Sequence, residues 1–284
     1  MKDTILPYRL LDTGNLQKLE MAGPYKLIRP ALTAFWTPTL PEKEWGDADG
    51  IFIRDAGGNG KWHWRKKVPE SWKLRWGDFV LTVKPTGFGH LGFFAEQFRN
   101  WAFFSEWLSK IPEAKALNLF AYSGVGSMAM ARGGAQVCHL DASRGMIEWG
   151  RGNLPDNPQV PDRIRWIADD VNKFVKREIR RGSRYQLIAL DPPTFGRGTS
   201  GQLWKIESDL PLLLEDCRQL LAQEGPVCLD LSCHSPGFTP LVLERLLRRT
   251  FGKNGTVSVT EMSIPESTGS ELPSGFSARY LRES

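Results

Sequence analysis

The sequence predicts an α/β fold in which an open, mostly parallel sheet follows a smaller β-rich region. Two observations support this prediction. After residue 85, short apolar runs alternate with helical segments, and turns or acidic residues follow the apolar runs. Before residue 86, most of the 11 tryptophans lie among short strand-like runs that turn residues separate. We therefore expect a β-rich region over residues 1–85 and an α/β domain over residues 86–284.

Composition and charge fit a soluble protein with a full hydrophobic core. The 284 residues allow one or two domains, and 41% hydrophobic with 24% charged residues is ordinary for a globular protein. No apolar run approaches the ~20 residues of a membrane span, and the first residues lack the apolar stretch of a signal peptide. The net charge of +5 is compatible with a polyanionic partner but does not single out nucleic acid.

The cysteines are spaced for neither metal binding nor disulfide formation. Cys138, Cys217, Cys228 and Cys233 form no C-x-x-C pair, so we expect no metal and no disulfide framework. This pattern is typical of a protein in the reducing cytosol. We therefore expect a cytoplasmic protein without membrane contact, and the oligomeric state stays open.

Three strand-like runs lie in the N-terminal region, at residues 51–54, 61–65 and 79–83, and a turn cluster at residues 56–60 separates the first two. Residues 61–67 alternate aromatic with basic side chains, which could bind RNA through stacking and phosphate contacts. We favour the simpler interpretation of a half-buried strand with tryptophan on one face, because the two faces of a strand alternate in any case.

A glycine-rich turn connects the first strand of the α/β domain to a helix. Residues 116–120 form a short buried strand, Gly124 and Gly126 mark the turn, and a helix starts near Ser127. Such a turn lets a ligand approach the backbone closely and directs helix amide groups toward it. A purely structural βα turn is the alternative interpretation.

The second predicted strand, residues 136–140, ends at Asp141. An acid at this place is where nucleotide-binding α/β sheets bond ribose hydroxyls. The phosphate-binding signatures G-x-G-x-x-G and G-x-x-x-x-G-K-[ST] are both missing. The expected ligand therefore carries an adenosine but no pyrophosphate, and S-adenosylmethionine fits that description.

Two further predicted strands end in acidic residues. Residues 164–167 precede Asp169 and Asp170, either of which could bond the adenine amino group, and residues 185–190 lead directly into Asp191. Ligands of open α/β sheets bind outside the carboxyl ends of the strands. These acids are therefore candidate ligand contacts.

Two prolines give Asp191 a particular setting. Pro192 and Pro193 hold the residues before them extended and remove two amide donors. A rigid turn thereby presents the Asp191 carboxylate and backbone carbonyls at the mouth of the sheet, where they can bind the amino or imino edge of a planar base. A structural loop is the alternative.

The connector over residues 86–101 is rich in glycine and aromatic residues and enters a helix before the first strand of the α/β domain. This position suits a lid over the cofactor. Phe93 and Gln97 are candidate contacts, although packing explains the aromatic side chains equally well.

The C-terminal part is expected to complete the sheet. An amphipathic helix over residues 241–251 precedes two strand-like runs at residues 256–264 and 276–281. We expect the two runs to form a closing antiparallel pair.

The motifs N-L-F-A-Y-S-G, L-D-A-S, A-D-D-V and D-P-P-T-F-G-R-G together resemble those of class I S-adenosylmethionine-dependent methyltransferases. The resemblance is nearest to the bacterial 23S ribosomal RNA group that includes the large-subunit cytosine-C5 enzyme, and it covers about residues 86–240. It implies a Rossmann-like seven-stranded sheet in which the glycine turn holds the methionine part of S-adenosylmethionine, the acid after the second strand holds the ribose, and the D-P-P loop faces the target base. The residues implied for cofactor binding are Phe93, Gln97, Asn118, Phe120, Ser123, Gly124, Gly126, Asp141, Ala142, Ser143, Asp169, Asp170, Val171, Asp191 and Pro192, and those implied for substrate binding are Pro193, Phe195 and Arg197.

The strand predicted over residues 226–231 is followed by Cys233. The cytosine-C5 enzymes resembled here carry a nucleophilic cysteine in an S-C-S segment at the matching strand end. A covalent step suits cytosine, because C5 is a poor nucleophile until a thiolate adds to C6. The resemblance therefore implies that Cys233 is the nucleophile and that neighbouring His234, which replaces the expected serine, favours the thiolate. An ordinary buried cysteine is the alternative.

We expect a methyltransferase that uses S-adenosylmethionine and modifies a base in ribosomal RNA, with cytosine C5 favoured and with Asp191 and Cys233 catalytic. The first alternative is methylation of a ring nitrogen or an exocyclic amine, in RNA or a smaller substrate, without a covalent step. Thr194 separates Pro193 from Phe195, which argues mildly against the adenine-N6 type. The second alternative is a non-catalytic RNA-binding scaffold with a vestigial cofactor pocket.

Overall fold

The computed structural model describes residues 5–55, 60–197 and 203–283, and the chain packs as two compact units. The first unit comprises the residues up to Glu96 together with residues 155–157 and 263–274. The second unit comprises residues 97–154, residues 158–262 and the residues from Gly275 onward.

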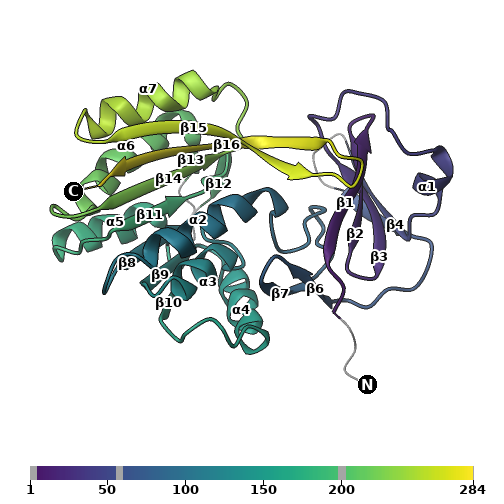
Figure 1. Cartoon of the computed structure of the whole chain (residues 1–284), viewed down its shortest axis with the longest axis horizontal. Coiled ribbons are helices and arrows are strands. Elements are labelled where there is room, and N and C mark those ends of the chain that lie inside the picture. Colours follow the sequence, from purple (N-terminus) through teal and green to yellow (C-terminus); the bar gives the residue numbers. More distant parts are fainter. Residues whose placement is uncertain (1–4, 56–59, 198–202, 284) are drawn as a thin grey trace. The chain divides into compact units, whose positions relative to one another are not determined.

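The first unit is built on a five-stranded sheet with the strand order β1-β2-β3-β4-β5 (Figure 1). Neighbouring strands are antiparallel except for the parallel pair of β3 and β4. Gly23 and Gly77 have φ values of 65° and 55° in the hairpin turns that follow Ala22 and Trp76, a conformation that glycine adopts without strain. The elements are β1 (Tyr8–Gly14), β2 (Gln17–Ala22), β3 (Tyr25–Pro30), α1 (Glu42–Gly46), β4 (Gly50–Arg54), β5 (Gly60–Trp64) and a separate hairpin of β6 (Trp72–Trp76) and β7 (Phe79–Val83).

Strand β5 confirms the simpler interpretation of the aromatic and basic run. Its residues alternate between half-buried and exposed positions along the strand. Trp62 and Trp64 share one face, where their rings stack with centroids 4.9 Å apart. Lys61 and His63 are exposed on the other face. The alternation in sequence therefore follows from the two faces of a strand.

A buried ionic cluster lies inside the first unit. The Glu20 carboxylate is fully buried, and it accepts a hydrogen bond from the Tyr8 hydroxyl at 2.8 Å and a pair of hydrogen bonds from the Arg29 guanidinium. Arg29 also donates to the Gly89 carbonyl at 2.9 Å. A buried carboxylate is tolerable only when it is paired in this way. Tyr8, Glu20 and Arg29 therefore depend on one another.

The second unit contains a seven-stranded sheet with the order β10-β9-β8-β11-β14-β16-β15. The first five strands in this order are parallel, and β16 is antiparallel to β14. The chain runs outward from β8 through β9 to β10 on one side and from β11 to β14 on the other, so the strand order reverses between β8 and β11. The strands are β8 (Lys115–Leu119), β9 (Gln136–Asp141), β10 (Ile164–Ala168), β11 (Leu187–Leu190), β14 (Val227–Cys233), β15 (Thr256–Pro265) and β16 (Glu271–Arg282).

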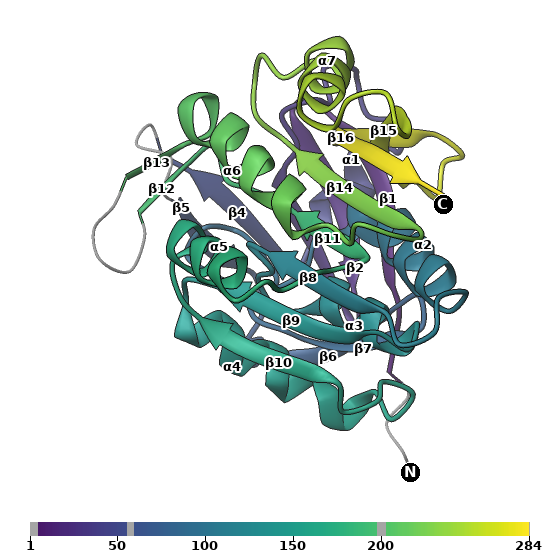
Figure 2. The same ribbon diagram turned by 90° about the vertical axis from the view of Figure 1, so that its left-hand side faces the viewer.

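Helices cover both faces of this sheet (Figure 2). Helices α2 and α3 pack together, α4 packs beside β10, and α5, α6 and α7 form the layer on the other face. The predicted Rossmann-like sheet of seven strands with a β-rich N-terminal region is thereby confirmed. The helices are α2 (Phe98–Leu108), α3 (Val125–Arg132), α4 (Arg144–Asn153), α5 (Val171–Arg180), α6 (Ile206–Leu220) and α7 (Pro240–Phe251); single 3-10 turns are η1 (Ala95–Gln97) and η2 (Leu154–Asp156), and β12 (Phe195–Arg197) pairs with β13 (Leu203–Lys205).

The centre of the sheet is buried on both faces. Every residue of β11 and of β14 is buried, as expected for parallel strands between two helix layers. One of these residues, Asp230 in the middle of β14, is acidic, and it pairs with Arg279 of β16. Across the described residues, no helix is both long and apolar enough to span a membrane.

We expect Arg29→Met to lower the free energy of unfolding by about 3–5 kcal/mol, because the buried Glu20 carboxylate loses the guanidinium that hydrogen-bonds to it and keeps only the more distant cation of Lys18, 3.9 Å from Oε2. Urea denaturation measures this loss. The control is Lys66→Met, since Lys66 pairs with Asp49 at 2.7 Å but is 54% exposed, and an exposed pair contributes about 0–1 kcal/mol. Equal losses of unfolding free energy in the two variants would show that the buried cluster stabilises the fold no more than an exposed ion pair does.

Candidate active site

Several of the predicted site residues lie at one edge of the sheet in the second unit. Leu190 of β11 pairs in register with Leu119 of β8, and the adjacent strands β9 and β14 pair in the same phase. The glycine turn after β8, Asp141, Asp191 and Cys233 therefore leave the sheet at its carboxyl edge. This edge includes the point between β8 and β11 where the strand order reverses, which is the usual ligand position in such sheets.

The turn after β8 has an unusual backbone. Phe120, Tyr122 and Gly124 have φ values of 55°, 51° and 85°, so three alternate residues are left-handed. A left-handed residue other than glycine is strained, and such strain is concentrated at functional sites. Helix α3 begins directly afterward with Gly124 as its N-cap, and glycine has no side chain that could cap the first amide groups. These amide groups are thus suited to an acidic or polar ligand.

Packing behind the turn explains why glycine is required. A Cβ atom at Gly124 would lie 2.8 Å from the Trp166 ring, and one at Gly150 of α4 would lie 2.6 Å from the same ring. At Gly126, a Cβ atom would come within 3.2 Å of the Asn118 amide nitrogen. The turn and the two helices after it therefore enclose the Trp166 ring closely, which fixes the backbone that a cofactor would contact.

The Asp141 carboxylate is placed for a ribose. Its Oδ2 accepts a hydrogen bond from the Tyr122 amide at 2.9 Å, and its Oδ1 accepts one from the Ser143 amide at 2.8 Å. Burial raises the pKa of the Asp141 carboxyl, and these two amide bonds oppose the rise. A carboxylate can accept about four hydrogen bonds, so roughly two positions are left for the hydroxyls of a ribose. The residues present thus fit S-adenosylmethionine at this edge.

Asn118 lies beneath the turn. Its amide donates to the Ser127 hydroxyl at 3.0 Å, and Ser127 contacts Nδ1 of His139 at 2.9 Å. His139 is fully buried, and burial lowers its pKa to about 3, so the ring is neutral. The direction of the hydrogen bond between Ser127 and His139 depends on which ring nitrogen of His139 carries the hydrogen. These three side chains join β8, α3 and β9 under the turn.

The two acids after β10 have different local partners. Asp170 is the N-cap of α5 and accepts a hydrogen bond from the Lys173 amide at 3.0 Å. Asp169 forms an ion pair with Arg177 of the same helix, which keeps the pKa of its carboxyl low against the effect of burial. Val171 is the buried first residue of α5. The contact of Asp169 or Asp170 with the adenine amino group stays a prediction.

The other predicted cofactor contacts occupy varied environments. Ser123 is buried in the turn, Ala142 is exposed after Asp141, and Ser143 caps α4 by accepting from the Met146 amide at 3.4 Å. Phe120 is half-buried, with its ring 5.1 Å from that of Trp204. Their contacts with a cofactor stay predictions.

Phe93 belongs to the first unit. Its side chain is buried there, edge to face with the Tyr8 ring at a centroid distance of 5.3 Å. Packing therefore accounts for its aromatic character within its own unit. The cofactor contact predicted for Phe93 stays a prediction.

Asp191 has partners on both carboxylate oxygens. Gln97, the last residue of η1, donates from Nε2 to Oδ2 of Asp191 at 3.0 Å. Nε2 of His234 lies 3.5 Å from Oδ1 of Asp191. Gln97, predicted as a cofactor contact, is thus a direct partner of the predicted catalytic carboxylate.

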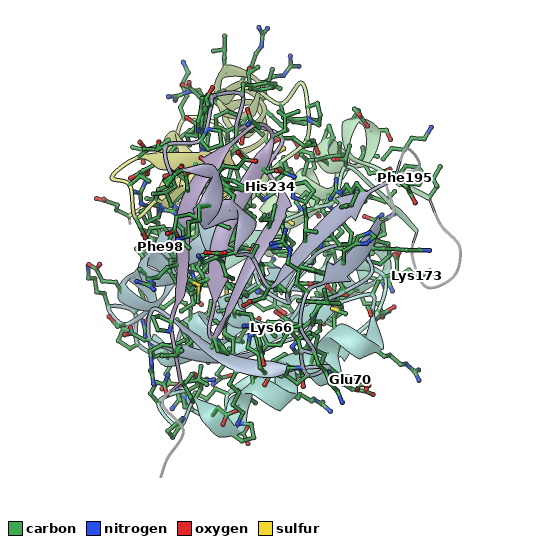
Figure 3. All side chains as sticks on the ribbon, turned by 90° about the vertical axis from the view of Figure 1, so that its right-hand side faces the viewer. Lys66, Glu70, Phe98, Lys173, Phe195 and His234 are labelled. Carbon is green, nitrogen blue, oxygen red and sulfur yellow. The ribbon has the colours of Figure 1, made fainter. Side chains whose placement is uncertain are left out.

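Several contacts fasten the D-P-P loop. The Trp204 indole donates to the Pro193 carbonyl at 2.7 Å, and the hydroxyls of Thr194 and Ser235 lie 2.7 Å apart. Pro192 is buried, Pro193 is exposed, and Phe195 is 55% exposed. The Phe195 side chain is labelled in Figure 3. Arg197 ends β12, and its side chain lies outside the described part of the chain.

Cys233 ends β14 and is 1% exposed. Burial raises the pKa of its thiol, hydrogen bonds from Ser235 lower it, and the negative charge of Asp191 raises it further. His234 lies near Asp191, and its side chain is 37% exposed (Figure 3). In this arrangement the thiol lacks the electropositive, accessible setting of a reactive cysteine.

Four polar residues that support the site belong to no motif recognisable in the sequence. Asn100 and Arg279 connect to Gln97, and Ser127 and His139 lie under the glycine turn. One signal was present: an acid inside the apolar run over residues 226–231 requires a buried partner. Within the described residues, no group of three or more His, Cys, Asp or Glu side chains could hold a metal ion.

Comparison with known proteins agrees with this geometry. A family model described as S-adenosylmethionine-dependent methyltransferase matches residues 97–244. The crystal structure of the SAM-dependent methyltransferase from Agrobacterium tumefaciens is 35% identical, with a TM-score of 0.89 over 99% of this chain and 94% of that chain. A proposed SAM-dependent methyltransferase from Streptococcus mutans has the same fold at 15% identity, with a TM-score of 0.73 over 99% of this chain and 76% of that chain.

A curated relative gives a narrower match. The ribosomal RNA large subunit methyltransferase K/L of Aliivibrio salmonicida is 32% identical over 113 residues. This match covers 39% of the present chain and 16% of the relative. The present chain therefore corresponds to a small part of that protein.

We expect Gly124→Ala to weaken the binding of S-adenosylhomocysteine by about tenfold or more, because a Cβ there displaces Trp166 and the turn. Isothermal titration calorimetry measures the affinity. Gly134→Ala is the matched control, since Gly134 is also left-handed at φ 93° but has nothing within 4 Å of an added Cβ. Equal affinities in the two variants would contradict the role of this turn.

We expect Asp141→Asn to reduce the affinity for S-adenosylhomocysteine by roughly 10- to 100-fold, the value of one or two charge-assisted hydrogen bonds. The amide must also direct an NH2 group at a backbone donor, either Tyr122 or Ser143. Calorimetry with the exposed Asp162→Asn as control measures the difference. An unchanged affinity would remove Asp141 from the cofactor site.

Proposed function

Because the chain belongs to the S-adenosylmethionine-dependent methyltransferase family, we propose that its methyl acceptor is a base in ribosomal RNA. The enzyme uses S-adenosylmethionine, and the acceptor is the open question. The name of the Aliivibrio relative supports an RNA acceptor, as does the net charge of +5. An acceptor of this kind implies a cytoplasmic enzyme.

The observation that carries the proposal is the Asp191 carboxylate on the proline-stiffened loop. One of its oxygens is held by Gln97, and the loop is fastened by Trp204. The exposed Phe195 ring follows on the same loop and offers a face on which a base can stack. A carboxylate beside an aromatic face can take the amino or imino edge of an unstacked base.

Methyl transfer then depends mainly on how the acceptor base is positioned relative to the methyl group. When bound, S-adenosylmethionine supplies a sulfonium methyl group. Asp191 holds the amino edge of the base so that the nitrogen faces the methyl group, which is worth most when the reacting atoms are aligned. As the nitrogen gains the methyl group it becomes more acidic, and the Asp191 carboxylate accepts the proton. His234 lies 3.5 Å from Oδ1 of Asp191, and both side chains are partly exposed.

The buried state of Cys233 favours nitrogen over cytosine C5 as the acceptor atom. The covalent route requires a thiolate that can reach C6 of the base. A thiol that is 1% exposed and has a raised pKa supplies little thiolate at neutral pH. Transfer to an exocyclic amine or a ring nitrogen needs only the carboxylate. Cytosine C5 stays the second prediction, because Cys233 lies at the same strand edge as Asp191.

We expect Cys233→Ala to methylate ribosomal RNA within about twofold of the native rate and Asp191→Asn to lose about 100-fold or more, as expected for a group that handles a proton. The assay uses ribosomal RNA from a strain lacking this protein, labelled S-adenosylmethionine and mass spectrometry of nucleosides. Cys228→Ala is the matched control, since Cys228 is also buried in β14.

Loss of activity in Cys233→Ala alone, together with a trapped adduct on RNA that contains 5-fluorocytosine, would establish the covalent route instead. If the native protein methylates no RNA, the acceptor lies outside ribosomal RNA.

A further inference from the structure

We propose that a chain of side-chain hydrogen bonds, running from Arg279 through Asn100 and Gln97, positions the Asp191 carboxylate for the acceptor. This inference rests on the proposed function, which gives Asp191 its contact with the base. All four residues belong to the second unit. Asn100, Gln97 and Arg279 are positioning residues, since they act through Asp191.

The three hydrogen bonds follow one another without a gap. Nη2 of Arg279 donates to Oδ1 of Asn100 at 3.0 Å, and Nδ2 of Asn100 donates to Oε1 of Gln97 at 2.8 Å. Nε2 of Gln97 then donates to Oδ2 of Asp191 at 3.0 Å. Asn100 and Gln97 are both buried, so water does not compete strongly for these groups.

The two ends of the chain fix the direction of every bond. A guanidinium can only donate and a carboxylate can only accept. Oδ1 of Asn100 must therefore face Arg279, and Nε2 of Gln97 must face Asp191. Turning either amide around would bring two donors or two acceptors face to face. The hydroxyl of Ser232, which donates to Oε1 of Gln97 at 3.2 Å, supports the same direction.

The cationic end of the chain is firmly anchored. Arg279 of β16 pairs in register with Asp230 of β14, and Nε of Arg279 donates to Oδ2 of Asp230 at 2.6 Å. The hydroxyl of Ser277 also donates to Asp230, and the guanidinium carbon of Arg279 lies 3.5 Å from the Phe103 ring centroid. The Arg279 guanidinium is thus held by Asp230, Asn100 and the Phe103 ring.

Stability alone does not account for this buried ion pair. Asp230 is fully buried, and burial raises the pKa of its carboxyl although Arg279 opposes the rise. Replacing a buried ion pair by apolar residues is often neutral or stabilising, so such a pair is weak evidence for a stabilising role. A role for Arg279 in fixing the direction of the amide chain explains why a charge lies in the centre of the sheet.

The anchored carboxylate has two distinct oxygens. Oδ2 of Asp191 is held by Gln97, whereas Oδ1 lies on the side of His234. Rotation of the carboxylate would break the bond to Gln97. The hydrogen-bond chain therefore leaves Oδ1 as the oxygen that meets the acceptor, and it favours the ionised carboxylate because the amide of Gln97 donates to it.

Asn100→Asp tests the direction of the chain with almost no change in shape. The new carboxylate pairs with Arg279 but cannot donate to Gln97. The Gln97 amide must then turn to donate to residue 100, which places its Oε1 against Oδ2 of Asp191. We expect the titration midpoint of the Asp191 carboxyl, followed by carbon-13 NMR, to move up by about one pH unit or more.

In the same variant we expect kcat on ribosomal RNA to fall by about tenfold or more, because a carboxylate that Gln97 no longer orients is poorly aligned with the acceptor, while the affinity for S-adenosylhomocysteine stays within about twofold. His234 and Cys233 are titratable groups near Asp191, and their titrations are followed in the same samples. Asn254→Asp is the matched control, because Asn254 is exposed in the turn after α7.

A double-mutant cycle separates a relay from a general structural effect. If Asn100 acts through Gln97, the shift caused by Asn100→Asp is much smaller in a Gln97→Leu background than in the native background. Equal shifts in the two backgrounds, or no shift in Asn100→Asp, would overturn the proposal. If Asn100→Asp does not fold, Gln97→Glu keeps the bond from Asn100 but presents an acceptor to Asp191, and the same upward shift is expected.

The NMR titration needs no RNA. If the native protein fails to methylate ribosomal RNA but the Asp191 midpoint shifts as expected, the proposed acceptor is wrong and the positioning chain stands. If RNA is methylated and the midpoint does not move, the positioning chain is wrong and the proposed function stands.

Discussion

The hydrogen-bond register of the parallel strands is the constraint on which the rest of the site depends. Strands β9, β8, β11 and β14 end in phase, so residues far apart in sequence leave the sheet side by side. A slip of one residue between two parallel strands would turn every side chain to the opposite face. The continuous burial of β11 and β14 prevents such a slip, because both of their faces are packed against helices. The same burial that stabilises the sheet therefore positions Asp141, the glycine turn and Asp191.

The strands, the turn after β8 and the acids at the strand ends could be predicted from sequence because their signals are local. A short apolar run indicates a buried strand, glycine indicates a special backbone, and a proline pair stiffens its loop. The structure confirms the sheet and brings Asp141 and Asp191 to the edge where the sequence pattern placed them. The left-handed Phe120 and Tyr122 could not be foreseen, since neither residue type favours that conformation.

The side-chain partners could not be predicted, because they depend on tertiary structure. Asn100 and Arg279 are 179 residues apart in sequence, and no local pattern relates them. The burial of Cys233 is also a tertiary property: its motif resembles that of a nucleophile, whereas its thiol is packed inside the sheet. Gln97 was predicted from sequence as a cofactor contact. The structure shows in addition that its side chain donates a hydrogen bond to Asp191. Motifs thus indicated which groups could react, and packing determines which of them are accessible.

The position of β16 in the sheet has a consequence for biosynthesis. This strand follows all the other described strands in the chain, yet it lies between β14 and β15 and carries Arg279. A ribosome therefore completes every neighbouring strand before the one that fills the gap emerges from the exit tunnel. Until then Asp230 has no counter-charge and Asn100 has no donor to orient it. The nascent polypeptide accordingly completes this part of its sheet only after β16 has emerged.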